Sequence, residues 1–114
     1  MKSKEMLTEE QRRRASRVLQ ALANPLRLEI MQALTESSLT CSELQTLLGC
    51  PQSTLSLQLK MLVDQGLVAT TREGTVKHCS IRNREFLDLF TCLQRHLTEF
   101  LQEVSDKKES RRAR

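Results

Sequence analysis

Residues 50–62 read CPQSTLSLQLKML, and the spacing of their leucines predicts a helix. Leu55, Leu59 and Leu62 recur at helical intervals and form one apolar stripe of an α-helix. The opposite side carries short, neutral hydrogen-bonding groups in place of the charges that are usual on a solvated helix. These groups are Gln52, Ser53, Thr54, Ser56 and Gln58, joined by Lys60. Such a face is suited to hydrogen bonding with the edges of DNA bases.

The residues just before this helix predict a shorter helix and a tight link. Thr40 and Glu43 form the pattern of a capping box, which begins a helix. Gly49 is suited to end it, because many helices close on a glycine. Only Cys50 and Pro51 then separate the two helices. This arrangement predicts a helix-turn-helix, although any two packed short helices share the spacing.

The segment that follows predicts a β-hairpin. Residues 67–81 read LVATTREGTVKHCSI, two strands around a turn signal at Glu73 and Gly74. Arg72 and Lys77 flank the turn and can reach outward. A helix-turn-helix followed by a hairpin with basic flanks is the order of a winged helix. The alternative is a purely structural β-ribbon.

Two further helices are predicted upstream, over residues 8–23 and about 25–35. Thr8 and Gln11 fit a capping box for the first of them. Asn24 is a good N-cap and Pro25 is favoured at the first helical position, so the chain breaks and restarts there. The second helix carries apolar side chains at helical spacing: Leu26, Ile30, Met31 and Leu34.

A last helix is predicted over about residues 84–104, where an apolar stripe is sustained over several turns. The stripe consists of Phe86, Phe90, Leu93, Leu97 and Phe100. Aromatic side chains concentrated on a terminal helix indicate a subunit interface. The alternative is that this helix packs on the first helix of its own chain, and both arrangements can hold together.

The predicted organisation is one small domain with short flanking segments. The chain has 114 residues, of which 39% are hydrophobic and 28% charged, as in ordinary globular proteins. We expect a domain over residues 8–104, a flexible N-terminus over 1–7 and a disordered basic tail over 105–114. The sequence has no apolar run of membrane-spanning length and begins without a signal peptide, which predicts a cytoplasmic protein without a membrane partner.

Charge and cysteine content narrow the function classes. The net charge is +4, and the basic residues concentrate toward the two ends of the chain. This distribution is compatible with a polyanionic partner, and equally with a role in solubility. The four cysteines form no C-x-x-C pair, so a zinc finger or a thioredoxin-like centre is not indicated. In a reducing compartment they are free thiols.

Residues 18–82 resemble the ArsR/SmtB family of winged-helix repressors. The resemblance lies in ALANPLRLEIMQAL, in S-x-Q-L-K-x-L from Ser56 and in QGLV-x-x-x-REG, in this order and spacing. It implies a fold of the α/β class, mainly α, with about five helices and a two-stranded hairpin wing. It also implies a homodimer that pairs through the first and last helices, and that leaves its DNA operator when an inducer binds.

The resemblance also implies roles for individual residues. It places residues 52–64 as the recognition helix, with Gln52, Ser53, Thr54, Ser56 and Gln58 facing the major groove of double-stranded DNA. Many family members carry histidine where Gln58 stands, so base preference differs at that point. Lys60, Arg72 and Lys77 are suited to phosphates, which position a protein without reading sequence.

The inducer sites known in this family are matched incompletely. The three cysteine positions of the arsenite type are here Thr40, Ser42 and Gln45. Of the zinc type, only the half-motif His96-x-x-Glu99 is present. Asp88, Cys92 and His96 lie on one helix face and could bind a soft metal, particularly if dimer symmetry doubles them. The alternative is a polar border beside the apolar stripe.

The alternative to a metal is an inducer that reacts with cysteine thiols. The second helix lacks the cysteine of the family's thiol switches, and the simplest account makes these cysteines small core side chains. Cys41 is the exception, because a helix N-terminus lowers the pKa of a thiol, and Cys92 is the other candidate for thiol sensing. No cofactor is indicated beyond a metal ion or thiol modification as inducer.

An enzyme is not predicted, because the sequence has no glycine-rich phosphate-binding loop and no Ser-His-Asp order, and its two histidines lie in the predicted wing and the last helix. A winged-helix module that binds another protein through its last helix is the alternative to a DNA-binding repressor. A protein-binding face would favour leucine, methionine or aromatic residues on residues 52–64, where only Leu57 interrupts the polar groups.

Overall fold

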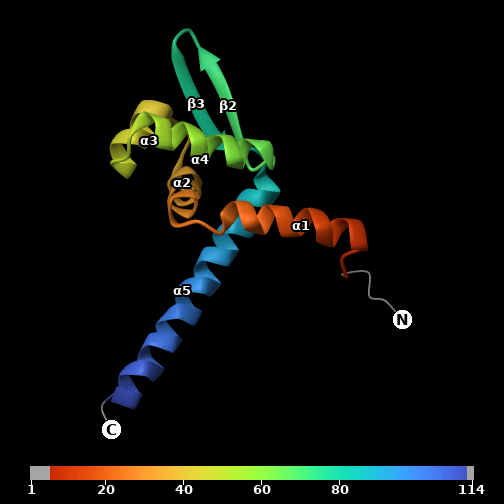
Figure 1. The fold of residues 1–114 in the computed structure, drawn as a ribbon, viewed down its shortest axis with the longest axis vertical. Helices are drawn as coiled ribbons and strands as arrows, with labels where there is room; N and C mark the ends of the chain where they lie inside the picture. Colours follow the sequence, from red (N-terminus) through yellow and green to blue (C-terminus); the bar gives the residue numbers. More distant parts are fainter. Residues whose placement is uncertain (1–5, 113–114) are drawn as a thin grey trace. The chain divides into compact units, whose positions relative to one another are not determined.

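A computed structural model describes residues 6–112 of the chain. The described residues form five helices and a three-stranded sheet (Figure 1). In chain order these are α1 (Glu9–Leu22), α2 (Pro25–Glu36), β1 (Leu39–Thr40), α3 (Cys41–Leu48), α4 (Gln52–Asp64), β2 (Val68–Glu73), β3 (Val76–Ile81) and α5 (Arg84–Arg112). The chain divides after Arg82 into two compact units.

Side-chain caps begin the first three helices, as the sequence predicts. Thr8 and Gln11 exchange hydrogen bonds of 2.9 and 3.1 Å at the start of α1. Thr40 and Glu43 do the same at α3, and the bond from the Thr40 backbone N–H lowers the pKa of the Glu43 carboxyl. Asn24 caps α2 by accepting from two backbone N–H groups. These bonds satisfy donors that have no partner within the helix.

The core of the first unit brings together the predicted apolar stripes. Leu55, Leu59 and Leu62 of α4 are at most 2% exposed. They are joined in the core by Ala21, Leu22, Ile30, Met31, Leu34, Leu44, Leu67, Val68 and Cys79. The predicted inward face of α4 is therefore confirmed, and its packing fixes which side chains α4 presents on its other side.

The sheet differs from the predicted two-stranded hairpin. A third strand, β1, pairs antiparallel with β3, with Leu39 opposite Cys79. A strand of two residues is too short to show the alternation by which a sequence signals a strand. The turn is also one residue later than predicted, because Glu73 pairs with Val76 and leaves Gly74 and Thr75 as the loop. Gly74 has φ +63°, a left-handed conformation that glycine adopts without strain.

The second unit is the single helix α5, which is longer than predicted (Figure 1). The expected disordered tail over 105–114 is wrong for 105–112, which are helical; residues 113–114 lie outside the described residues. The Glu103–Lys107 pair at 3.6 Å and the 3.1 Å bond from Gln102 to Asp106 support these turns. Basic residues in the last turn favour the negative end of the helix dipole.

The N-terminal expectation is tested only in part. Of the predicted flexible residues 1–7, residues 1–5 lie outside the described residues. Met6 and Leu7 precede α1 without being helical, and the carbonyl of Leu7 accepts a 2.7 Å hydrogen bond from Arg12. Within residues 6–112, no helix is both long and apolar enough to cross a membrane.

The apolar stripe of α5 changes character along the helix. Near its start, the rings of Phe86 and Phe90 stack with their centroids 6.4 Å apart, and Phe90 is buried. Leu93 is partly exposed. Further on, Leu97 is 41% exposed, and Phe100 and Leu101 are each 59% exposed. The second half of α5 therefore presents bulky apolar side chains to solvent.

Candidate nucleic-acid interface

The outer face of α4 is exposed and mostly neutral. Its exposed side chains are Gln52, Ser53, Ser56, Leu57, Lys60, Met61 and Asp64. Thr54 and Gln58 are half-buried at the edges of this face. Hydroxyl and amide groups can both donate and accept hydrogen bonds, which is the chemistry needed to read base edges.

The start of α4 differs from those of α1, α2 and α3. Pro51 is its N-cap, and within the described residues no side chain caps its first backbone N–H groups. Uncapped N–H groups at a helix start, together with the helix dipole, attract an anion such as a phosphate. The beginning of α4 is therefore suited to a DNA backbone as well as to bases.

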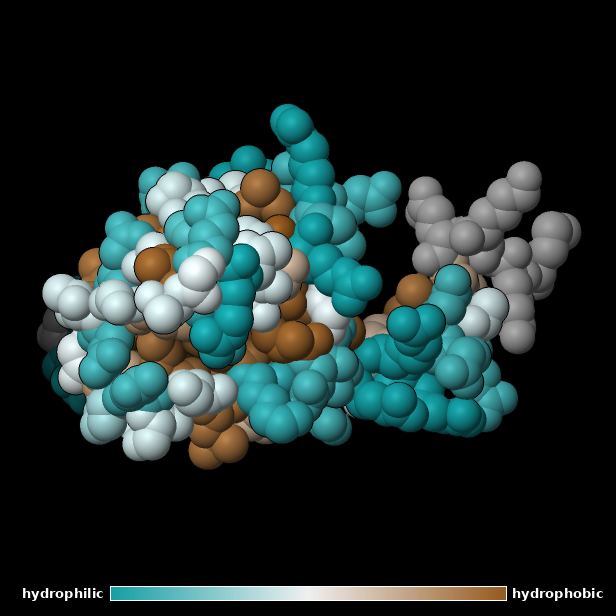
Figure 2. All heavy atoms as spheres, turned by 90° about the horizontal axis from the view of Figure 1, so that it is seen from above, coloured by the Kyte–Doolittle hydropathy of each residue, from teal (hydrophilic) through white to brown (hydrophobic). Residues whose placement is uncertain are grey.

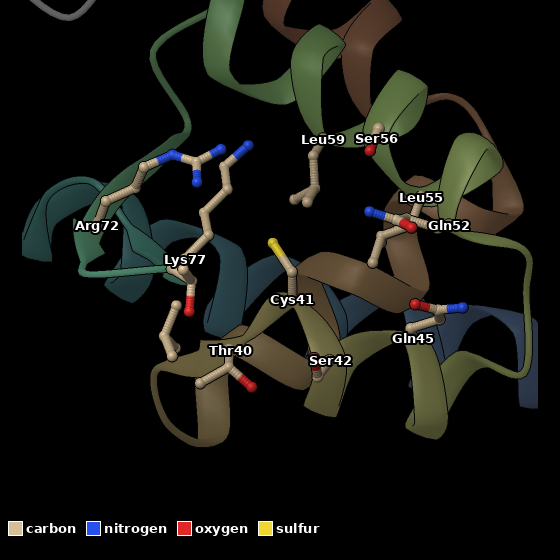
Figure 3. Close-up of a pocket in the computed structure, with 12 residues that line it drawn as sticks. Thr40, Cys41, Ser42, Gln45, Gln52, Leu55, Ser56, Leu59, Arg72 and Lys77 are labelled. Atoms are coloured by element: carbon tan, nitrogen blue, oxygen red, sulfur yellow. The ribbon is translucent and has the colours of Figure 1, made fainter.

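A cavity of about 430 Å³ lies between α3, α4 and the β2–β3 hairpin (Figure 3). Gln45, Gln52 and Ser56 line one side of it, and Arg72 and Lys77 line the other. The sulfur of Cys41 points into the space between them (Figure 3). Neutral hydrogen-bonding groups and positive charges thus face the same cavity from different elements.

The two basic residues of the hairpin are held side by side. Arg72 of β2 is the register partner of Lys77 of β3, and both side chains extend in the same direction (Figure 3). Lys60 of α4 instead forms an exposed 2.9 Å ion pair with Asp64, which offsets part of its charge. The hairpin pair is therefore the better placed of the predicted phosphate contacts.

The view onto the hairpin tip supports this description of the surface. Figure 2 shows that hydrophilic and near-neutral residues cover most of the visible face, with smaller apolar patches between them. Leu57 and Val76 are among the exposed apolar side chains of this unit, at 59% and 44% exposure. Exposed apolar side chains beside the polar groups of α4 are compatible with contacts to base methyl groups.

Gln58 lies differently from the other predicted base-contacting residues. Its amide oxygen accepts a 2.8 Å hydrogen bond from the guanidinium of Arg27. Arg27 also donates to the carbonyls of Ala21 and Gln20 at the end of α1. One buried arginine therefore connects α1, α2 and α4. Its hydrogen bond to the amide oxygen of Gln58 fixes the position of that side chain.

Arg27 is not among the functional residues predicted from the sequence, although its position on the apolar stripe of α2 indicates that it is buried. Arg27 stands three, four and seven residues before Ile30, Met31 and Leu34, on the buried face of α2. A charge on an apolar stripe requires internal partners, because burial of an unpaired charge is costly. The end of α1 supplies them: Arg27 donates to the carbonyls of Ala21 and Gln20, and α1 has no basic residue in its last turn.

The structure brings two cysteines together. The sulfurs of Cys41 and Cys79 are 3.5 Å apart, across 38 positions of sequence. Cys79 is fully buried, as predicted for a core side chain, and this burial raises the pKa of its thiol to about 12, with a contribution from the hydrogen bond to Cys41. Cys41 is half-buried, and Cys92, the other predicted sensing residue, lies 3.8 Å from a guanidinium nitrogen of Arg95.

The predicted metal ligands are not assembled within one chain. Asp88, Cys92, His96 and Glu99 all lie on α5. In the described part of the chain, no three histidine, cysteine, aspartate or glutamate side chains gather closely enough to hold a metal ion. A single copy of α5 therefore does not bring enough donors together for a closed tetrahedral site.

Several known proteins are similar to this chain in sequence. A helix-turn-helix domain family matches residues 22–71. The arsenical resistance operon repressor of Staphylococcus xylosus is 41% identical over 73 residues, which cover 64% of this chain and 69% of that protein. The transcriptional repressor SmtB homologue of Synechocystis is 30% identical over 95 residues, which cover 83% of this chain and 72% of that protein.

Solved structures agree with these relatives. The homodimeric winged helix-turn-helix DNA-binding domain of Mb0332 from Mycobacterium bovis has a TM-score of 0.77 and 28% identity to this chain. The match covers 89% of this chain and 95% of that domain. The predicted winged helix-turn-helix fold is thereby confirmed.

Proposed function

The chain belongs to the ArsR/SmtB family of winged-helix transcriptional regulators, and on this premise we propose that it is a repressor that binds operator DNA. The exposed, neutral face of α4 beside the Arg72–Lys77 pair is the observation that carries the proposal. In this role α4 enters the major groove and reads bases, while the hairpin contacts phosphates. The role is one of binding, and we propose no catalytic activity.

The individual contacts follow from exposure. Gln52, Ser53 and Ser56 are free to reach base edges, and Thr54 can do so from the margin of the face. Lys77, Arg72 and Lys60 take phosphates. Gln58 contributes mainly by fixing α4 against Arg27, since its oxygen already has a partner. The positive flanks and the uncapped start of α4 favour DNA over an acidic protein surface.

We propose that the active form is a homodimer paired through α1 and α5. The exposed Leu97, Phe100 and Leu101 of α5 and Leu19 of α1 are apolar surfaces that a second copy would cover. The Mycobacterium bovis neighbour is described as a homodimer. Two copies of α4 would then meet half-sites about one or two helical turns of DNA apart. Because the proposed partner is operator DNA, we propose a cytoplasmic location.

The proposed inducer is a thiol-reactive species or a metal ion. The relatives include a repressor named for arsenical resistance, so thiophilic chemistry is represented among them. In this chain the close pair of sulfurs favours the thiol route. A metal held by Asp88, Cys92, His96 and Glu99 would need α5 of both copies to complete the donor set.

Removing the base-reading groups tests the proposal directly. An operator is first selected from random DNA duplexes by the unaltered protein. We expect Gln52→Ala combined with Ser56→Ala to weaken binding to this operator about tenfold or more, since one good bidentate base contact contributes about 1–3 kcal/mol. Binding to random duplex DNA should change little, because phosphate contacts remain. Fluorescence anisotropy on both DNAs measures the difference.

The control for this test is Gln32→Ala, which removes an exposed amide from α2. An operator preference that survives the double substitution unchanged would contradict the assignment of α4 as the reading helix. In that case the alternative, a winged-helix module that binds protein, would gain support.

Removing a hairpin charge should have a different signature. We expect Lys77→Ala to weaken operator and random DNA alike and to lower the slope of log affinity against log salt by about 1. The reason is that one fewer counterion is released on binding. Titrations at several salt concentrations measure the slope. Arg13→Ala is the matched control, because Glu9 and Glu10 already pair its charge; an unchanged slope for Lys77→Ala would remove it from the interface.

A further inference from the structure

The contact between Cys41 and Cys79 joins two parts of the DNA-binding unit. Cys41 is the first residue of α3, the helix before the recognition helix. Cys79 lies on β3, the central strand of the sheet and one arm of the hairpin. A covalent bond between the two sulfurs would therefore tie the helix-turn-helix to the wing.

The two thiols differ in access. Cys41 lines the cavity between α3, α4 and the hairpin, and its sulfur points into that space (Figure 3). Cys79 is fully buried behind it, 3.5 Å from the Cys41 sulfur. A small oxidant entering the cavity reaches Cys41 first and leaves Cys79 in position to respond.

We propose that Cys41 and Cys79 form a reversible disulfide when the protein meets a hydroperoxide, and that this bond lowers the affinity for DNA. The sequence indicates Cys41 and Cys92 as candidate sensing residues, whereas the packing of α3 on β3 brings Cys79 next to Cys41. The regulatory part of this inference rests on the proposed function, whereas the bond itself does not.

The disulfide forms from the two thiols and a hydroperoxide in two steps. The Cys41 thiolate attacks a hydroperoxide, so an S–O bond forms, the O–O bond breaks and an alcohol or water leaves after taking up a proton. The Cys79 thiol then attacks the sulfur of this sulfenic acid, forming the S–S bond while the hydroxyl leaves with the thiol proton as water. Two thiols lose two electrons in total and the hydroperoxide gains them. A dithiol reductant reverses the bond by exchange.

Formation of the disulfide would affect the elements that are proposed to contact DNA. A disulfide needs its sulfurs about 2.05 Å apart, so the two must approach by roughly 1.5 Å. Cys79 is held in the core, and Cys41 begins a helix whose cap is the Thr40–Glu43 pair. Side-chain rotation closes part of this gap, and the bond then fixes the start of α3 to β3. A bond between these two elements limits how α4 and Lys77 adjust to one DNA duplex.

Peptide mapping tests the bond. The reduced, folded protein is treated with a small excess of hydrogen peroxide, blocked with iodoacetamide and digested with trypsin plus a protease that cuts after glutamate. This digestion places Cys41 in residues 37–43, Cys50 in another peptide and Cys79 in residues 78–82. We expect the first and last of these to be linked, and to separate on reduction. Both peptides recovered as unlinked thiols, or Cys41 linked to Cys50 or Cys92, would overturn the inference.

DNA binding tests the regulation. The operator is selected from random duplexes by the reduced protein, and its affinity is then measured reduced, oxidised and re-reduced. We expect oxidation to lower the affinity about tenfold, a common size of coupling between two sites. Cys41→Ser and Cys79→Ala should each abolish this response, whereas Cys50→Ser and Cys92→Ser should retain it. The folded state of each variant is checked by circular dichroism, and Cys41→Ser serves if the core variant unfolds.

The outcomes separate the two proposals. A linked pair with unchanged affinity would overturn the regulatory inference and leave the repressor function standing. A reduced protein that selects no DNA sequence would overturn the proposed function, while the peptide map would still decide whether the bond forms.

Discussion

Replacement of Arg27 by alanine is expected to lower the free energy of unfolding by roughly 3 kcal/mol, because hydrogen bonds to a buried charged group contribute about 1.5–3 kcal/mol and their loss leaves partners unsatisfied. Arg27 donates to the carbonyls of Gln20 and Ala21 and to the amide oxygen of Gln58. All three acceptors lose a donor in the variant. Denaturant titration, at one fixed protein concentration, measures the change.

The matched control is Arg14→Ala, which removes an exposed arginine from α1 and should change stability by less than about 0.5 kcal/mol. Arg27→Lys keeps a positive charge but offers a different donor geometry, so we expect an intermediate loss. Equal stabilities of the Arg27→Ala and Arg14→Ala proteins would show that the connection of α1, α2 and α4 contributes nothing. Gln58→Ala should reproduce only a small part of the loss, since the two carbonyls of α1 keep their donor.

Replacement of Phe100 by glutamate is expected to raise the dissociation constant of the proposed homodimer roughly 30-fold or more, because interface hot spots contribute about 2 kcal/mol or more. Phe100 is 59% exposed, and its neighbour Leu97 is 41% exposed on the same apolar stripe. A charge at this position must be buried without a partner if the dimer forms. Analytical ultracentrifugation over a range of concentrations measures the constant.

Arg95→Glu is the control for this variant, because Arg95 is exposed and lies two residues from Leu97, about 200° around the helix. It should leave dimerisation nearly unchanged. If Phe100→Glu remains as dimeric as the unaltered protein, α5 is not the interface. Loss of the dimer should also weaken operator binding, since the two half-sites are then bound independently.

Local signals predicted most of the helical fold because their partners are close in sequence. Thr8 with Gln11 and Thr40 with Glu43 are three residues apart, and each pair satisfies its own helix start. The stripe of Leu55, Leu59 and Leu62 likewise specifies which face of α4 is buried. The end of α5 differs from the predicted disordered tail, because a charged segment with few apolar residues resembles a disordered one, whereas its i, i+4 pairs support a helix.

The helix-turn-helix, the hairpin and the neutral outer face of α4 can be predicted from the sequence, since each depends on periodicity or on contacts within a few residues. Three features that bear on function depend instead on tertiary packing. These are the β1–β3 pairing, the bond from Arg27 to Gln58 across 31 positions, and the contact of Cys41 with Cys79 across 38 positions. Such contacts form only after separate elements pack together, so no spacing along the chain predicts them.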